Sequence, residues 1–266
     1  MNGEDKQTYR GRIAPTPSGY LHEGHAQTFR TAWERARGAG GAVVFRNDDL
    51  DPDRCRPSFA EAAMKDLRDI GLDWDEGPDL GGPFGPYDQS ARSSLYLSTW
   101  RRLKDAGVIY PCPRTRREIR EASSPSNDGE EPLFPVDFRP SPGTGSECDE
   151  PGPINWRFRT PLGQEIRFDD GNLGPQAFEV GRDFGDFLVW RKDGVPAYEL
   201  ATVVDEEEMR ITEVVRGTDL LKSTARQMLV FQALNWEPPR FFHCPLVLDA
   251  EGRKLSKSAR ISLGRA

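Results

Sequence analysis

The sequence predicts an α/β fold built on a doubly wound parallel sheet. Two short apolar segments, near residues 12–14 and 41–46, are typical of buried strands. Segments with apolar residues at helical spacing lie near 26–36, 57–70 and 89–106. Alternation of strand and helix favours parallel strands with helices on the faces of the sheet.

The composition is that of a globular protein with one large or two modest domains. The 266 residues are 36% hydrophobic and 30% charged, and no apolar run approaches the roughly 20 residues of a membrane helix. The polar start is unlike a signal peptide and the four cysteines lack C-x-x-C spacing, so we expect a reduced, cytoplasmic setting. A net charge of −7 argues against general nucleic-acid coating but does not exclude a local basic patch.

The stretch Arg12-Ile-Ala-Pro-Thr-Pro-Ser-Gly-Tyr-Leu-His-Glu-Gly-His25 joins the first strand to the first helix. A turn that leads into a helix N-terminus offers backbone N–H groups and the helix dipole to an anion. Gly19 and Gly24 let a ligand approach the backbone closely. His22 and His25, three residues apart at the helix entrance, can face one polyphosphate. For such a stretch in isolation, the alternative is a strand-turn-helix unit with two surface histidines.

An acidic turn at 47–54 follows the second strand, and a loop rich in glycine and proline covers 77–86. The composition then changes. Residues 101–120 hold seven Arg or Lys against two acids, which indicates either a phosphate-contacting face or a solvated helix surface. Residues 121–152 hold one Arg against eight acids with many Pro, Ser and Gly, and they predict a flexible or irregular insertion.

Regular structure is expected to resume in the second half as strands, one helix and a final core strand. Ser223 is the expected N-cap of that helix. The strands are expected near 154–160, 164–168, 186–191, Tyr198 to Val204 and Arg210 to Val215, the helix from Ser223 to Leu234, and the last strand from Phe241 to Leu248.

The Lys/Ser-rich stretch Lys254-Leu-Ser-Lys-Ser258 follows that last strand. By itself it is typical of a solvated loop. Together with the stretch from Arg12 to His25, it resembles the two ATP-binding motifs of class I aminoacyl-tRNA synthetases, known as HIGH and KMSKS. The order and separation of the two motifs agree with that class.

Further motifs narrow the resemblance to the glutamyl-tRNA synthetase family, and the similarity covers nearly the whole chain outside the acidic insertion. Full members carry a helical anticodon-binding region after the KMSKS-like loop, whereas this chain ends eight residues after Ser258. On that ground we expect the truncated branch, whose members attach glutamate to queuosine in the anticodon of tRNA(Asp). The motifs are Arg12-Ile-Ala-Pro-Thr-Pro-Ser-Gly19, Arg46-Asn-Asp-Asp-Leu-Asp-Pro52, Gly185-Asp-Phe-Leu-Val-Trp-Arg-Lys-Asp-Gly194, Ala197-Tyr-Glu-Leu-Ala201 and Val215-Arg-Gly-Thr-Asp-Leu-Leu221.

The resemblance implies a Rossmann-like class I catalytic domain in two parts, residues 1–95 and 191–266, around an α+β acceptor-type insertion at 96–190. It implies that glutamate attacks the α-phosphate of ATP, with Mg²⁺, and that the glutamyl group then passes to a hydroxyl of the tRNA. Positioning and charge stabilisation should dominate both steps. The residues implied for ATP and catalysis are Gly19, His22, Gly24, His25, Lys254 and Lys257.

Glutamate carries two carboxylates and an ammonium, and the family pattern implies six residues for it: Arg12, Ala14, Thr16, Asp48, Tyr198 and Arg216. Either arginine can offer a planar fork to a carboxylate, and the sequence leaves open which carboxylate each one takes. Asp48 departs from the family, which commonly has Glu at this position for the substrate ammonium. Because Asp is one methylene shorter, the ammonium must lie deeper or a water must bridge, and Asp49 and Asp51 are nearby alternatives.

A second departure concerns the zinc site of the truncated branch, C-x-C followed by Y-x-x-x-C. Here the corresponding residues are Cys112-Pro-Arg114 and Phe134-Pro-Val-Asp-Phe138. One candidate ligand remains, phenylalanine binds no metal, and Cys148 is isolated, so we expect no zinc.

The expected partners are glutamate, ATP and the anticodon stem-loop of tRNA(Asp), with no membrane, and the protein is expected to be a monomer. One alternative is a minimal glutamyl-tRNA synthetase that charges the 3′ end of tRNA(Glu). The other is a non-catalytic paralogue that binds nucleotide or tRNA without making adenylate.

Overall fold

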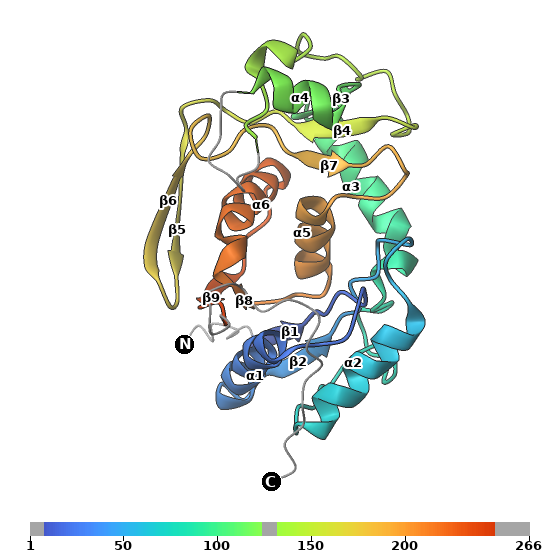
Figure 1. Ribbon diagram of the computed structural model, residues 1–266, viewed down its shortest axis with the longest axis vertical. Coiled ribbons are helices and arrows are strands. Elements are labelled where there is room, and N and C mark those ends of the chain that lie inside the picture. Colours follow the sequence, from blue (N-terminus) through green and yellow to red (C-terminus); the bar gives the residue numbers. More distant parts are fainter. Residues whose placement is uncertain (1–7, 124–131, 248–266) are drawn as a thin grey trace, which may run out of the picture.

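Four parallel strands form the layer on which the molecule is built (Figure 1). The structure is a computed structural model that describes residues 8–123 and 132–247. Strand β1 (Arg10–Ile13) pairs with β2 (Ala42–Phe45), and β8 (Glu213–Gly217) pairs with β9 (Arg240–Cys244). The two pairs meet where the amide of Thr212 donates to the carbonyl of Arg10 at 2.9 Å.

Helices cover both faces of this layer. Gly11 faces α1 (Glu23–Gly38), where an added Cβ would lie 3.3 Å from the Cβ of Ala36. The next residue, Arg12, points to the other face and bonds to Glu206 of α5 (Tyr198–Glu208). The helices α2 (Pro57–Asp69) and α3 (Ser93–Asp105) follow β2 in chain order. The predicted α/β fold class is therefore confirmed, together with the two strands and three helices predicted in the first 106 residues.

The segment between α3 and α5 builds a second, antiparallel layer, seen at the top of Figure 1. Its sheet consists of β3 (Ile109–Cys112), β4 (Asn155–Phe158) and β7 (Leu188–Trp190), with α4 (Arg116–Ala122) beside it. The sequence had not predicted β3 or α4.

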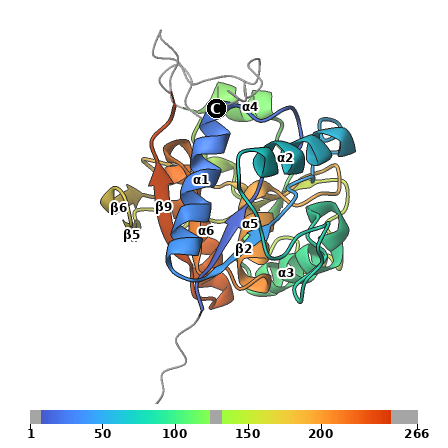
Figure 2. The same ribbon diagram turned by 90° about the horizontal axis from the view of Figure 1, so that it is seen from below.

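A hairpin of β5 (Glu165–Asp170) and β6 (Gly174–Glu179) leaves this segment and joins the parallel layer. Asp170 pairs in parallel with Phe241 of β9. Figure 2 shows the hairpin beside β9, on the side of the molecule away from α2 and α3.

Two expectations for the second half were wrong. The expected strand at Tyr198 to Val204 is the first part of α5, because a short apolar run does not distinguish a buried strand from a buried helix. The helix is buried all round from Leu200 to Glu206, which removes the amphipathic spacing that would have identified it. Ser223 is not an N-cap, since α6 (Leu221–Leu234) begins two residues earlier, after a 3-10 turn at Thr218–Leu220.

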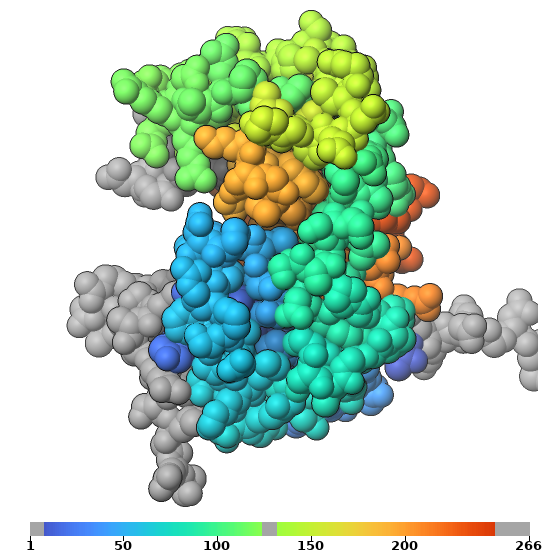
Figure 3. Space-filling view, turned by 90° about the vertical axis from the view of Figure 1, so that its right-hand side faces the viewer, coloured from blue at the N-terminus to red at the C-terminus, as the bar shows by residue number. Residues whose placement is uncertain are grey.

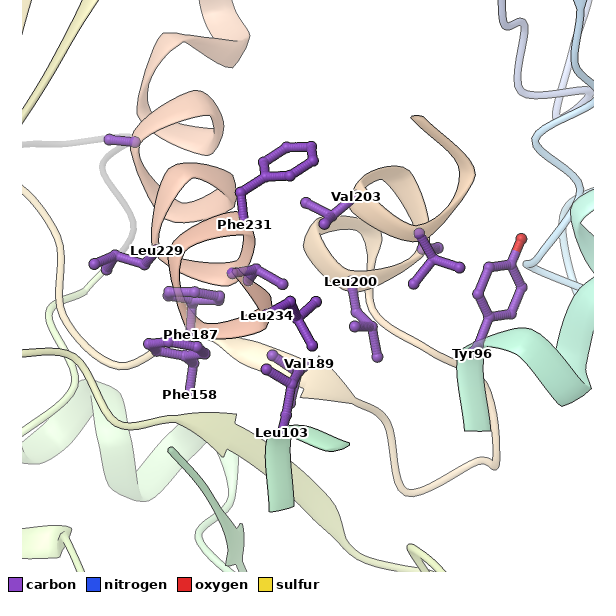
Figure 4. Packing of buried hydrophobic residues seen from close by; sticks show 14 of the residues in the cluster. Tyr96, Leu103, Phe158, Phe187, Val189, Leu200, Val203, Leu229, Phe231 and Leu234 are labelled. Atoms are coloured by element: carbon purple, nitrogen blue, oxygen red, sulfur yellow. The ribbon is translucent and has the colours of Figure 1, made fainter. Parts of the chain in front are cut away.

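One hydrophobic core runs through both layers. Tyr96 and Leu103 of α3, Leu200 of α5 and the stacked rings of Phe158 and Phe187 belong to it (Figure 4). In Figure 3 the orange surface near β7 and the start of α5 lies between the green and yellow insertion and the blue and cyan lobe below. The insertion therefore packs on the parallel layer, and the domain boundaries expected at 95/96 and 190/191 stay a prediction.

Aromatic side chains surround Cys112, at the place where the sequence resemblance implied zinc ligands. Cys112 is buried with Tyr110, Ile119 and Phe134, and Phe138 packs on this cluster. Within residues 8–123 and 132–247 no three His, Cys, Asp or Glu side chains are grouped to hold a metal, and no helix is long and apolar enough to cross a membrane. These surroundings do not fit a zinc ion, because they offer one thiolate among aromatic rings.

The protein is accordingly expected to fold without zinc. Metal analysis of protein purified without added zinc should give well under one zinc per chain, and a chelator should leave the thermal midpoint unchanged, because apolar packing replaces the metal here. A stoichiometric zinc that resists dialysis would contradict this expectation.

Candidate active site

A pocket of about 380 Å³ opens at the carboxyl ends of β1, β2 and β8, where ligands bind in open α/β sheets. Every predicted site residue that the structure describes lines this pocket. These residues are Arg12, Ala14, Thr16, Gly19, His22, Gly24, His25, Asp48, Tyr198 and Arg216. The other two predicted residues, Lys254 and Lys257, lie outside the described part of the chain.

The two histidines lie at the entrance of α1. Their rings stack with centroids 3.7 Å apart and planes at 23°. An added Cβ at Gly24 would meet the ring of His22 at 3.2 Å, so glycine leaves room for the imidazole in this arrangement. Gly24 and His25, in the first turn of α1, line the pocket, and the start of a helix suits a phosphate group.

Arg216 is a buried cation with only neutral hydrogen-bond partners among the described residues. Its Nη2 donates to Thr224 Oγ1 at 2.6 Å and to Gln227 Oε1 at 2.8 Å. Its Nη1 donates to the Tyr198 hydroxyl at 3.2 Å, and its Nε to His243 Nε2 at 3.3 Å. In the described part of the chain one N–H of Nη1 is left without an acceptor.

Burial lowers the pKa of Arg216, and the positive charge of Arg12 nearby lowers it further. A buried cation without a carboxylate partner is costly to keep charged. An anion in the pocket would offset this cost and would also accept from the remaining N–H and from the Tyr198 hydroxyl.

Arg12 and Arg46, in contrast, already have carboxylate partners. Arg12 Nε lies 3.0 Å from Glu206 Oε1, and Arg46 Nη1 lies 3.3 Å from the same oxygen. Arg46 Nε also lies 2.6 Å from Asp48 Oδ1. Burial by itself would raise the pKa of Glu206, but the two arginines outweigh this effect and hold the pKa below its usual range.

Buried arginines and carboxylates form ion pairs around the pocket. Four arginines (Arg12, Arg46, Arg92 and Arg216) lie with three carboxylates (Asp48, Asp205 and Glu206). Arg12, Arg46 and Arg92 are paired with these carboxylates, whereas Arg216 has no carboxylate partner among the described residues.

Sequence reasoning missed the ion pairs of Arg46, Arg92, Asp205 and Glu206. Assigning α5 as a helix would have placed Asp205 and Glu206 near the pocket.

Asp48, one of these paired carboxylates, lines the pocket. Burial raises the pKa of its carboxyl group to about 6, although Arg46 opposes the shift. A ligand cation next to Asp48 would favour the ionised form.

A groove of about 480 Å³ adjoins the pocket and shares Thr16, Asp48 and Tyr198 with it. Six arginines line the groove: Arg54, Arg116, Arg120, Arg157, Arg191 and Arg226. The basic stretch at 101–120 is thus divided, because Arg116 and Arg120 reach the groove while Arg102 lies over the ring of Trp236 elsewhere.

The sequence of residues 8–263 matches the family model for class I tRNA synthetases (E and Q), catalytic domain. The chain belongs to this family. As a member of it, the chain is a class I aminoacyl-tRNA synthetase-like ligase, and the resemblance predicted from its sequence motifs is confirmed.

Two relatives show which branch of the family the chain resembles. It is 46% identical over 257 residues to the glutamyl-Q tRNA(Asp) synthetase of Nitratidesulfovibrio vulgaris and 48% identical over 252 residues to that of Symbiobacterium thermophilum. Each alignment covers 93% of this synthetase chain and 77% of the relative. The expected similarity to the truncated branch is confirmed by these two relatives.

Longer members of the family are also similar. The chain is 39% identical to the glutamate–tRNA ligase of Symbiobacterium thermophilum over 255 residues, which are 94% of the chain and 52% of the ligase. The solved glutamate–tRNA synthetase of Elizabethkingia anophelis superimposes with a TM-score of 0.82 at 30% identity over 94% of the chain. The synthetase chain spans about half the length of these longer relatives.

Proposed function

We propose that this protein activates glutamate with ATP as glutamyl-adenylate and transfers the glutamyl group to queuosine in the anticodon of tRNA(Asp). The observation that carries the activation step is the buried Arg216, which lacks a carboxylate partner among the described residues and lies in one pocket with the histidines of α1. The acceptor is proposed from the two glutamyl-Q tRNA(Asp) synthetases at 46% and 48% identity.

The positions of the charged groups suggest how glutamate lies. The reacting carboxylate loses its charge in the adenylate, so an arginine that needs a lasting anion suits the side-chain carboxylate instead. Arg216 and the Tyr198 hydroxyl supply donors for it, and Asp48 receives the ammonium. Arg12, Ala14 and Thr16 complete the pocket. The α-carboxylate is then directed towards the histidines at the start of α1.

In the activation step an oxygen of the α-carboxylate attacks the α-phosphorus of ATP, and the bond to the β-phosphate oxygen breaks as pyrophosphate leaves. His22 and His25 donate hydrogen bonds to phosphate oxygens, and the backbone at Gly19 and Gly24 lets the phosphates approach the helix N-terminus. Lys254 and Lys257 are proposed, from the sequence alone, to neutralise the departing pyrophosphate. Mg²⁺ is expected to accompany ATP and supply further positive charge.

The arginine-lined groove is proposed to hold the acceptor. It joins the glutamate pocket at Thr16, Asp48 and Tyr198, so an acceptor hydroxyl in it can reach the activated carboxyl group. Arginines suit phosphates of either a stem-loop or a 3′ end, and they carry little sequence information. Queuosine has a cyclopentene cis-diol that can imitate a terminal ribose, so one site can recognise the modified nucleoside and react with it.

The acceptor is tested with labelled glutamate, ATP and tRNA from cells grown with or without the queuosine precursor. Label is expected only on the modified tRNA and on an anticodon-loop fragment after nuclease digestion. Equal labelling of both pools, or label on the 3′-terminal adenosine, would favour a synthetase that charges tRNA(Glu). This second function is favoured by the TM-score of 0.82 with a glutamate–tRNA synthetase.

Two substitutions separate binding from chemistry in glutamate-dependent pyrophosphate exchange. Arg216→Ala should raise the glutamate KM, at a cost of roughly 2–5 kcal/mol, because the substrate carboxylate loses its buried partner.

Lys257→Ala should lower kcat and leave the glutamate KM nearly unchanged. The charge that Lys257 is proposed to neutralise, on the departing pyrophosphate, develops late in the step. The exposed Arg167, paired with Glu165, gives the control Arg167→Ala, which should behave as the native protein. Exchange absent in the native protein would favour the non-catalytic paralogue.

Glutamate binding should weaken as the pH falls through about 6. Burial raises the pKa of Asp48 to about 6, and the substrate ammonium binds the ionised carboxylate, so affinity is full above this pH and is lost below it. Calorimetric titration of glutamate between pH 5 and 7.5 checks this sign. An affinity that stays constant over that range would show that Asp48 does not receive the ammonium.

A further inference from the structure

Behind Arg216, on the side away from the pocket, lies a buried histidine that none of the proposed steps uses. His243 of β9 is fully buried, and its Nε2 lies 3.3 Å from Arg216 Nε and 3.0 Å from Thr224 Oγ1. Its Nδ1 lies 2.6 Å from Oδ2 of Asp170, at the end of β5. Asp170 itself is buried.

The protonation state of His243 follows from its neighbours. An arginine side chain can only donate, so Nε2 must accept the hydrogen bond from Arg216 Nε. The proton of the neutral ring therefore lies on Nδ1 and is donated to Asp170. A proton on Nε2 would instead place two donors against each other. Burial lowers the pKa of His243, and the charge of Arg216 acts in the same direction.

Asp170 is held so that it can set this tautomer. Its carboxylate also accepts from the backbone amides of Asn172 and Leu173, each at 3.0 Å, and from that of His243 at 3.2 Å. These bonds favour its ionised form and fix its position. The carboxylate thus stands at the head of a chain of hydrogen bonds that passes through the imidazole to the arginine.

We propose that Asp170 and His243 are positioning residues for glutamate, which present an acceptor to Arg216 Nε and so aim the Nη1 edge of the guanidinium into the pocket. The inference rests on the proposed function, since it concerns how that glutamate site is held. His243 fixes Nε, and Thr224 and Gln227 fix Nη2. These bonds at two nitrogens hold the guanidinium in one orientation. Preorganisation of this kind lowers the cost of ordering the arginine when the substrate binds.

The arrangement also gives the hairpin a role. Asp170 belongs to β5, within the segment expected as the acceptor-type insertion, yet it pairs with β9 beneath the glutamate pocket. The insertion therefore supplies a residue to the support of the amino-acid site in addition to lining the groove.

Two amide substitutions of His243 test the proposal, because each retains one end of the imidazole. In His243→Asn the amide reaches the place of Nδ1 and can still donate to Asp170, but no acceptor remains for Arg216. In His243→Gln the carbonyl oxygen reaches the place of Nε2 and can accept from Arg216. The glutamate KM, the ATP KM and the thermal midpoint are measured for both variants in pyrophosphate exchange.

His243→Asn should raise the glutamate KM about tenfold or more, with the ATP KM unchanged, since a charged hydrogen bond is lost. His243→Gln should stay within about threefold of the native KM because it keeps that bond. If His243 only supports the fold, the Asn variant, which keeps the bond to Asp170, should bind glutamate at least as well as the Gln variant. That result, or equal KM values, would overturn the proposal.

If either variant melts below the assay temperature, Asp170→Asn replaces it. Its amide can donate to Nδ1 and move the imidazole proton to Nε2, against Arg216, so the glutamate KM should again rise about tenfold. An unchanged KM would overturn the proposal. A native protein without glutamate-dependent exchange would overturn the proposed function itself. If the native protein is active and the variants keep its glutamate KM, only this inference is overturned.

Discussion

The carboxylate of Glu206 joins the ends of β1 and β2 to α5, and the shape of the pocket depends on this shared contact. Arg12 Nε and Arg46 Nη1 lie 3.0 and 3.3 Å from one of its oxygens, and all three side chains are buried. Removing one partner from such a set typically costs about 3–5 kcal/mol, because charge is left buried without compensation. The pocket wall is therefore held by ion pairs across elements that lie far apart in the chain.

Charge compensation also explains why Arg216 differs from its neighbours. Glu206 and Asp205 neutralise the arginines beside them, whereas Arg216 is kept in place by hydroxyl, amide and imidazole groups. Neutral partners satisfy its N–H groups without removing its charge. A ligand with two carboxylates and one ammonium then finds a cation at Arg216 and a carboxyl group at Asp48.

The insertion is part of this arrangement through packing as well as through polar contacts. Asp186 accepts from the hydroxyl of Tyr110 at 2.5 Å and from the amide of Thr160 at 2.8 Å, which ties β3 and the residues after β4 to the segment just before β7. The core around Trp100 and Trp156, whose rings meet edge to face at 4.7 Å, continues into α5. Aromatic rings pack around Cys112, so apolar contacts help to hold this layer together.

The sequence by itself determined the features that depend on neighbouring residues. The strand, turn and helix from Arg12 to His25 are local, and their apolar spacing and glycines identify them without tertiary information. The motifs at Asp48 and Arg216 could likewise be recognised from short stretches, and the structure brings these residues into one pocket. Their roles in binding glutamate stay predictions.

Tertiary structure alone decided how the buried charges are shared. Arg12 and Glu206 are 194 positions apart, and neither residue type indicates that one is the partner of the other. The helix α5 was missed because burial on all sides removes the periodic pattern that predicts a helix. That Arg216 has neutral partners, and that His243 holds its Nε, follows only from the folded chain, because charge compensation depends on distances in space and a sequence specifies only the order of its residues.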